Sequence, residues 1–208
     1  MTPYYETELG KLYHGDCLEI MPMLEPVDFI FTDPPYLKEF LWSYSAISEN
    51  GTRLLPEGSW IFVYGATEHI RESLSRMDEH LDYFWIFVLN HSGGYPRMWH
   101  KKLLSGYKPV LVYTRGKPKI NPWMSTVHSV RMDKRFHKWG QGGGFAQQMI
   151  DMLTEKSDIV LDPFIGGGQV ASVCEELNRR WIGIEIEEKY CEIAAKRIEK
   201  ERSQLKLW

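Results

Sequence analysis

The tetrapeptide Asp33-Pro34-Pro35-Tyr36 places hydrogen-bond acceptors and a flat ring directly after an apolar run, residues 27–32. Such a run is typical of a strand covered on both faces, and open α/β sheets bind ligands at the carboxyl ends of their strands. Neither proline has a backbone N–H, so the turn presents carbonyl oxygens and the Asp33 carboxylate with two fewer competing donors. Acceptors that grip both hydrogens of an NH2 group favour a more nucleophilic nitrogen, and Tyr36 offers a face to a nucleobase. The pattern indicates a site for an exocyclic base amine; an ordinary turn with a buried tyrosine is the alternative.

A second motif, DPFIGGG, lies between an expected strand and an expected helix. Glycines at such a junction let a ligand approach the backbone closely. Glu185 ends the next expected strand, 19 residues after Gly166, where a carboxylate can hold the two hydroxyls of a ribose. This spacing admits a dinucleotide or a mononucleoside cofactor, but the Asp162 carboxylate would repel a pyrophosphate and attract ammonium and sulfonium groups. S-adenosylmethionine carries both groups. The candidate cofactor contacts from these segments are Asp162, Phe164, Gly166, Gly168 and Glu185.

The basic side chains are concentrated in the middle of the chain. Residues 94–140 hold eleven Lys or Arg and one acid, although the net charge of the whole chain is −3. Aromatic residues are interleaved with them, a mixture that neutralises phosphates and stacks on unpaired bases. Solvated faces usually mix both signs, so this segment favours nucleic-acid contact. The candidate contacts are Arg97, Lys101, Lys102, Lys117, Lys119, Arg131, Lys134 and Arg135.

Together, these motifs resemble those of the DNA amino-methyltransferases that modify adenine N6 or cytosine N4. The order matches the circularly permuted group, in which the catalytic DPPY precedes the glycine loop, and the resemblance covers residues 11–198. It implies that Asp16, in the segment LYHGDC, contacts the adenine of the cofactor, and that His137 and Trp139, in HKWGQ, lie near its methionine tail. It also implies direct methyl transfer to a flipped base, with no covalent enzyme intermediate and no metal. Within the family, an aspartate at the position of Asp33 goes mainly with adenine.

Two departures from the family pattern concern DNA recognition and the cofactor tail. The recognition insertion is short, residues 117–136, and the usual proline-containing turn after His137 is replaced by WGQGGG. The resemblance therefore says least about sequence specificity.

The elements that must position these motifs alternate along the chain. β-rich runs at 11–14, 27–32, 60–64, 83–90, 110–114, 159–161 and 181–186 are interspersed with apolar residues at helical spacing, including 145–153, 170–177 and 190–198. This alternation predicts an α/β fold, a mostly parallel sheet with helices on both faces. Residues 81–115 carry two β-rich runs around a stretch without a helix signal, which predicts one antiparallel edge hairpin. With the resemblance, the expected fold is a Rossmann-like methyltransferase sandwich.

Length and composition predict a single catalytic domain over residues 1–208, with basic excursions at 91–108 and 116–136. No apolar run could span a membrane, and the first ten residues lack signal-peptide features, so a cytoplasmic protein without a membrane partner is expected. The cysteines and histidines show no metal-ligand spacing. The expected partner is DNA, with the base flipped from a duplex or a single strand, and a homodimer is a further candidate.

Several alternatives stay open. The same motifs fit an N4-cytosine DNA methyltransferase or an RNA adenine methyltransferase. An NAD(P)-dependent oxidoreductase could use the GxGxxA pattern of Gly166, Gly168 and Ala171, but it leaves DPPY and the basic segment unexplained. An inactive nucleic-acid-binding module is a last alternative, against which the intact Asp33 argues.

Overall fold

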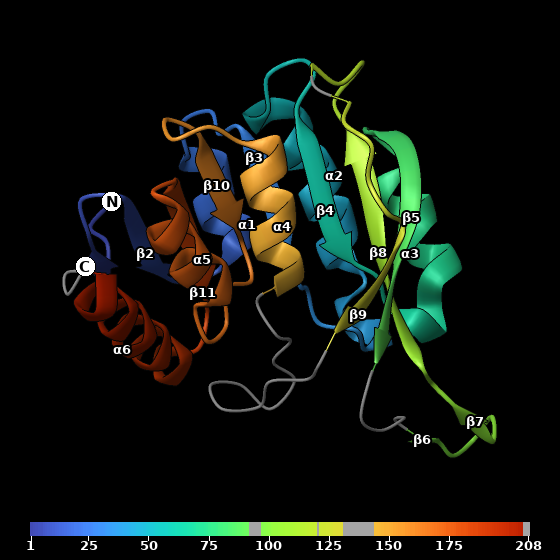
Figure 1. Cartoon of the computed structure of the whole chain (residues 1–208). Coiled ribbons are helices and arrows are strands. Elements are labelled where there is room, and N and C mark those ends of the chain that lie inside the picture. Colours follow the sequence, from blue (N-terminus) through green and yellow to red (C-terminus); the bar gives the residue numbers. More distant parts are fainter. Residues whose placement is uncertain (92–96, 120, 131–143, 206–208) are drawn as a thin grey trace.

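The computed structural model describes residues 1–91, 97–119, 121–130 and 144–205 (Figure 1). Within these residues, nine strands form one sheet in the order β1-β2-β11-β10-β3-β4-β8-β5-β9, and β6 pairs with β7. The strands are β1 (Tyr5–Glu6), β2 (Gly10–His14), β3 (Phe29–Thr32), β4 (Trp60–Tyr64), β5 (Asp82–His91), β6 (Arg97–Met98), β7 (Leu103–Leu104), β8 (Tyr107–Thr114), β9 (Val127–Val130), β10 (Ile159–Asp162) and β11 (Arg180–Glu185).

In the described parts of the chain, six α-helices accompany the strands: α1 (Cys17–Ile20), α2 (Trp42–Leu54), α3 (Ile70–Met77), α4 (Gly144–Leu153), α5 (Gln169–Leu177) and α6 (Glu188–Leu205). Short 3-10 helices cover Met21–Met23, Lys38–Phe40 and Thr67–His69. Among the described residues, no helix is both long and apolar enough to cross a membrane.

The sheet is mostly parallel, as the sequence predicts. Strands β2, β11, β10, β3 and β4 are parallel, whereas β8 is antiparallel to both β4 and β5. All seven predicted strands form, and the predicted antiparallel pair is β5 with β8. The pair is not the outermost part of the sheet, because β9 adds beside β5 in parallel. The sequence of β9, VHSV, has no continuous apolar run from which this strand could have been predicted.

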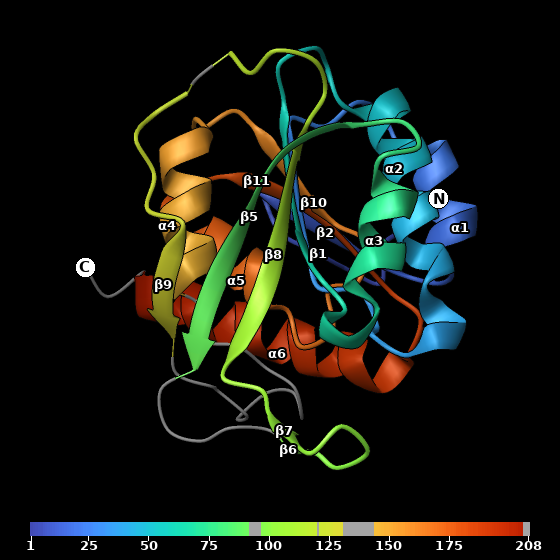
Figure 2. The same cartoon turned by 90° about the vertical axis from the view of Figure 1, so that its right-hand side faces the viewer.

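Helices cover both faces of the sheet, and Figures 1 and 2 show this three-layer arrangement from two sides. Helices α4, α5 and α6 contribute to a core with Phe31, Phe62 and Phe87, while α1, α2 and α3 contribute to a second core with Ile30 and Ile61. Successive strand residues thus enter opposite cores, which explains the continuous apolar runs. Burying one such side chain contributes about 1.5–3 kcal/mol.

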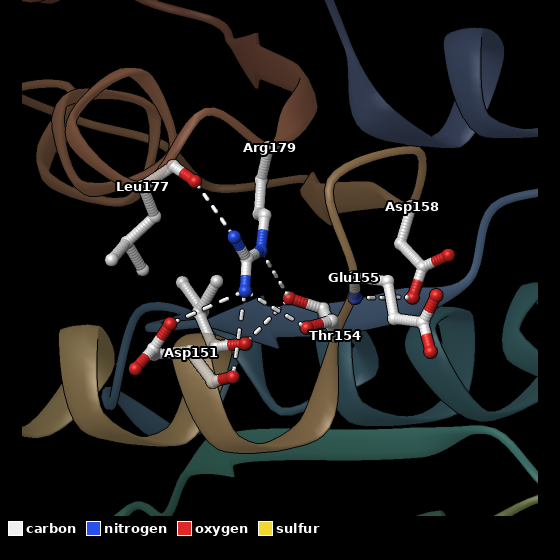
Figure 3. Close-up of polar contacts among 7 residues, drawn as sticks. Asp151, Thr154, Glu155, Asp158, Leu177 and Arg179 are labelled. Atoms are coloured by element: carbon white, nitrogen blue, oxygen red, sulfur yellow. Dashed lines mark hydrogen bonds and ion pairs between the residues drawn. The ribbon is translucent and has the colours of Figure 1, made fainter.

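Arg179 joins the end of α4 to the turn between α5 and β11 (Figure 3). Its guanidinium donates to the Leu177 carbonyl at 2.7 Å, to the hydroxyl and carbonyl of Thr154 at 3.2 and 3.0 Å, and to Asp151 Oδ1 at 3.2 Å. Asn178 caps α5 in the left-handed conformation, with φ of 55°. These contacts fix α4 relative to the helix that follows the glycine motif.

Candidate active site

The two chemical motifs meet because their strands are neighbours. The tetrapeptide directly follows β3, and the glycine motif begins at the last residue of β10. These two strands pair in parallel, with Leu161 opposite Ile30. Both motifs therefore emerge at the same carboxyl edge of the sheet, although 130 residues separate Thr32 from Asp162. The tetrapeptide comes first in the chain; circular permutation relative to the family stays a prediction.

Asp162 is held at the tip of β10 by two hydrogen bonds. Its Oδ1 accepts from the Thr32 hydroxyl at 2.7 Å and from the Phe164 N–H at 3.1 Å. The residue is only 4% exposed. Burial raises the pKa of its carboxyl to about 7, the two hydrogen bonds oppose this rise, and the charge of Glu185 adds to it. Asp162 therefore changes charge near neutral pH.

The Asp33 carboxylate pairs with a lysine that sequence reasoning did not place here. Lys108 Nζ, near the start of β8, lies 3.0 and 2.8 Å from the two Asp33 oxygens. The Lys108 side chain is 8% exposed and that of Asp33 is 32% exposed. Burial raises the pKa of Asp33, with a further rise from Asp162, and burial lowers the pKa of Lys108. The ion pair itself opposes both shifts, because each charge favours the other.

This pair corrects one interpretation of the basic segment. Lys108 is one of the eleven basic residues of the segment that favours nucleic-acid contact, but the structure buries it. The apolar run that follows it, residues 109–113, was a usable signal, since a lysine heading a buried strand needs a partner.

Two tyrosine rings flank the ammonium group of Lys108. Nζ lies 4.3 Å from the ring centroid of Tyr36 and 4.2 Å from that of Tyr64. The Tyr36 hydroxyl is buried and has no hydrogen-bond partner among the described residues. Within the tetrapeptide, Pro34 is buried and Pro35 exposed. The site thus combines a carboxylate with aromatic faces, the surroundings that bind cations and amines.

The glycine motif is shaped by conformation and by packing. Gly166 and Gly168 have φ of 49° and 76°, in the left-handed region that favours glycine. A Cβ on Gly168 would lie 2.8 Å from the Ala194 Cα of α6. The Glu185 carboxylate closes this loop, because its two oxygens accept from the Gly166 N–H at 3.0 Å and the Glu187 N–H at 2.8 Å. Burial raises the pKa of Glu185, and these N–H groups oppose the rise.

Asp16 lies beside this loop, at the end of β2. Its carboxylate caps α1 by accepting from the Leu18 N–H at 2.8 Å. His14, at the end of β2, pairs with Glu185, and the Gly15 N–H donates to the Glu185 carbonyl at 2.9 Å. Four carboxylates therefore stand at the ends of four consecutive strands, β2, β11, β10 and β3: Asp16, Glu185, Asp162 and Asp33.

This row of acceptors defines the ligands that the edge can take. Carboxylates accept hydrogen bonds from hydroxyl and ammonium groups, attract a cation and repel a pyrophosphate. Among the described residues, no group of three or more His, Cys, Asp or Glu could hold a metal ion. A cavity of about 380 Å³ lies at the opposite, amino ends of β10 and β11, where Ile159 and Arg180 are among its lining residues, away from the row.

Comparison with known proteins gives these features a family context. Residues 123–196 match a family model described as DNA methylase. The chain is 29% identical over 266 residues to the type II methyltransferase M.BamHI of Bacillus amyloliquefaciens, in an alignment that covers 99% of this chain. The chain is a relative of the DNA amino-methyltransferases. It spans 60% of the length of M.BamHI.

Solved structures show the same fold. PvuII DNA methyltransferase, titled cytosine-N4-specific, aligns with a TM-score of 0.82 and 18% identity over 97% of this chain and 93% of its own. M1.HpyAVI, solved as a complex with SAM, aligns with a TM-score of 0.73 and 24% identity over 91% of this chain and 99% of its own. The Rossmann-like methyltransferase fold predicted from the sequence is thereby confirmed.

The predicted nucleic-acid contacts of this methyltransferase relative are divided between two ends of the sheet. Arg97, Lys101 and Lys102 are exposed on the β6–β7 hairpin, which extends from the edge where the β4 arrow ends (Figure 1). Lys117 and Lys119 are exposed at the opposite edge, where the Lys119 N–H donates to the Gly58 carbonyl at 3.1 Å, just before β4. Five predicted site residues lie outside the described residues: Arg131, Lys134, Arg135, His137 and Trp139.

Proposed function

We propose that this chain is an S-adenosylmethionine-dependent DNA methyltransferase that methylates the exocyclic N6 of a flipped adenine. The observation that carries the proposal is the row of carboxylates at four consecutive strand ends, with the DPPY turn at one end of it. The matches to DNA methylases support the same activity. We further infer one catalytic domain, because all six described α-helices contribute to the two cores that flank the same sheet.

The cofactor half of the site is formed by β2, β11 and β10. Glu185 is the proposed partner of the ribose hydroxyls, and the proposal is supported by the lone pair that each of its oxygens keeps after accepting one backbone N–H. Asp162 lies where it can pair with an ammonium group, and Asp16 is the family's contact to the adenine ring. When bound, S-adenosylmethionine supplies a methyl group on a sulfonium, which is a good leaving group. The negative row disfavours NAD(P), whose pyrophosphate it would repel.

The base half is formed by the tetrapeptide. A base flipped from the stack would lie against Tyr36, with its amine hydrogens accepted by the Asp33 carboxylate and the Pro34 carbonyl. These acceptors orient the nitrogen toward the cofactor half and stabilise the positive charge that it gains as the new N–C bond forms. The Asp33 side chain is 32% exposed, which leaves room for the base to approach it from solvent.

The β6–β7 hairpin is the proposed contact to the DNA backbone. It projects from the same edge as the tetrapeptide, and Lys101 and Lys102 are exposed at its turn. The Arg97 guanidinium lies 5.3 Å from the ring centroid of the exposed Trp99, so the hairpin offers cations together with an aromatic face. This combination suits phosphates and unpaired bases.

Cytosine N4 is the second candidate target. It is supported by the alignment with PvuII DNA methyltransferase, titled cytosine-N4-specific. Both bases present an amidine-like NH2 to the same acceptors. Asp33 favours adenine, because within the family an aspartate at this position goes mainly with adenine as the target base.

The proposal is tested by incubating the protein with methyl-labelled S-adenosylmethionine and either DNA or RNA, then digesting to nucleosides for mass spectrometry. We expect label in N6-methyladenine from DNA. Label in N4-methylcytosine would transfer the assignment to the second candidate, and label from RNA alone would contradict DNA as the substrate. A thermal shift with NAD but none with S-adenosylmethionine would contradict the cofactor.

A further inference from the structure

Lys108 contacts the central acceptor of the proposed site, and no step described so far uses it. Its ammonium group donates to both Asp33 oxygens, at 3.0 and 2.8 Å, and is almost completely buried. β8 runs antiparallel to β4, with Val110 opposite Tyr64, so Lys108 enters the carboxyl edge from the first residues of β8. A buried lysine is costly unless it is paired, so this contact has to serve the fold or the site.

The geometry separates the side of Asp33 that faces Lys108 from the side that remains open. Lys108 approaches from within the protein, between the rings of Tyr36 and Tyr64. The Asp33 side chain remains 32% exposed. An ionised carboxylate has about four lone-pair sites, so bonds to Lys108 leave acceptor capacity for a ligand that arrives from solvent.

The remaining neighbours of Asp33 do not favour its charge. Partial burial and the negative charge of Asp162 both raise its pKa. The groups that face Asp33 are Lys108 from β8, Tyr64 from β4, Tyr44 from α2, Asp162 from β10 and Tyr36 from its own loop. Among the described residues that face Asp33, the cation is Lys108. Without it, burial and the charge of Asp162 would raise the pKa of Asp33 unopposed, and the protonated carboxyl would lose part of its capacity to accept an amine.

We propose that Lys108 is a positioning residue of the methyl-transfer site: its ammonium group keeps the Asp33 carboxylate charged and fixed, ready to accept the hydrogens of the target amine. This inference rests on the proposed function for its meaning in the reaction. The pairing itself can be measured without any turnover, which keeps the two claims separable.

The direct test is a carbon-13 NMR titration of the Asp33 side chain, whose signal is assigned by its disappearance in Asp33→Asn. Lys108→Met preserves the length of the side chain and removes its charge, and we expect it to raise the pKa of Asp33 by about one to three pH units. Lys117→Met, which replaces an exposed lysine at the opposite edge, is the matched control and should leave that pKa unchanged. An equal pKa in the parent protein and in Lys108→Met overturns the proposal.

The reciprocal titration covers the case in which Lys108→Met does not fold. If Lys108 keeps Asp33 charged, Asp33 must keep Lys108 protonated, because the coupling between two sites is mutual. In Asp33→Asn, the pKa of Lys108, followed at its ε carbon, should therefore fall by a similar amount. An unchanged value would contradict the pairing.

Measurements of turnover then test the role of Lys108 in methyl transfer. The acidic limb of the kcat profile reports loss of the charged carboxylate, so Lys108→Met should move this limb to higher pH and regain activity in alkaline buffer. A merely structural lysine would lower kcat by the same factor at every pH, and a lysine that obstructs the base would raise kcat at neutral pH; either result overturns the proposal. A parent protein that methylates no nucleic acid would instead refute the proposed function, while the titrations still decide the pairing.

Discussion

At the scale of single residues, Asp162 has surroundings that make its charge sensitive to pH. Its pKa of about 7 means that the carboxyl gains its charge as the pH rises through neutrality. A cationic cofactor favours the charged form, so S-adenosylmethionine should bind more tightly at pH 7.5 than at pH 6, by up to about tenfold. At both pH values most of an α-amino group, whose usual pKa is about 7.7–8.0, is protonated, and the sulfonium charge of the cofactor does not titrate. Calorimetry at the two pH values measures the change.

Two variants sharpen this prediction. Asp162→Asn should bind more weakly and lose most of the pH dependence. Thr32→Val removes the 2.7 Å hydrogen bond that lowers the pKa of Asp162, so the rise in affinity should move to higher pH. Affinity that is flat with pH in the parent protein would exclude Asp162 as the partner of the cation.

The position of a candidate site residue could be predicted from the sequence where its side chain ends a strand. Asp33, Asp162 and Glu185 each follow an apolar run, so the general rule for strand ends was enough to bring them to one edge. Lys108 is different, because it starts a strand and reaches that edge only through the antiparallel direction of β8. Its partner is 75 residues away in the chain, and no local pattern encodes such a distance.

At the scale of elements, the contacts of Arg179 predict a loss of stability when they are removed. Arg179→Ala leaves the carbonyls of Leu177 and Thr154 without their charged donor at the junction of α4 with α5. We expect the free energy of unfolding to fall by roughly 2–4 kcal/mol, because hydrogen bonds to charged groups contribute about 1.5–3 kcal/mol each and do not add fully. Urea denaturation measures it.

Arg180→Ala is the control, since this neighbouring arginine is exposed. Its effect should stay within about 0.5 kcal/mol, as is usual for surface substitutions. Equal decreases in the two variants would show that the contacts in Figure 3 do not stabilise the junction.

The β6–β7 hairpin gives a second element-scale prediction. Lys101→Gln with Lys102→Gln should weaken DNA binding and flatten its salt dependence, by about 0.9 in log–log slope for each phosphate that is no longer neutralised. Lys117→Gln with Lys119→Gln removes the same charge at the opposite edge and should have a much smaller effect. Fluorescence anisotropy across a salt series compares the two pairs. If both pairs weaken binding equally, the hairpin is not the specific DNA-binding element.

Element prediction failed where packing, rather than pattern, decides the structure. β9 has only four residues, two of them exposed and only Val130 buried, so it forms because β5 offers an unpaired edge. Helix α2 contains buried serines that weaken its apolar stripe, and one of them, Ser48, donates to the Met77 carbonyl of α3 at 2.8 Å. Such polar contacts across elements become visible only in the folded structure.

At the scale of the whole molecule, the sheet order explains how two motifs far apart in the chain form one site. β3 and β10 are adjacent, and the carboxylate row continues from them across β11 and β2. The alternation of strands and helices was sufficient to predict this parallel architecture, because strands buried on both faces require helices on both sides. The order of the strands across the sheet could not be predicted in this way, since composition and periodicity do not encode it.

The charged side chains of the molecule are also distributed unevenly around this edge of the sheet. The net charge of −3 hides a negative row at the carboxyl edge and a basic hairpin beside it. A cationic cofactor and a polyanion can therefore approach the same edge without competing for the same side chains.

The central claim is that Asp33 accepts hydrogen bonds from the target amine, while the cofactor binds at the ends of β2, β11 and β10. The measurement that tests it most directly compares Asp33→Asn with the parent protein, in methyl transfer to DNA and in S-adenosylmethionine binding. Asparagine keeps the shape of the side chain and replaces one acceptor oxygen with a donor, so turnover should fall by about 10²–10⁴-fold, the usual scale for such a group, while the Kd changes little. Turnover close to that of the parent, or a weakening of cofactor binding equal to the fall in turnover, would contradict the account.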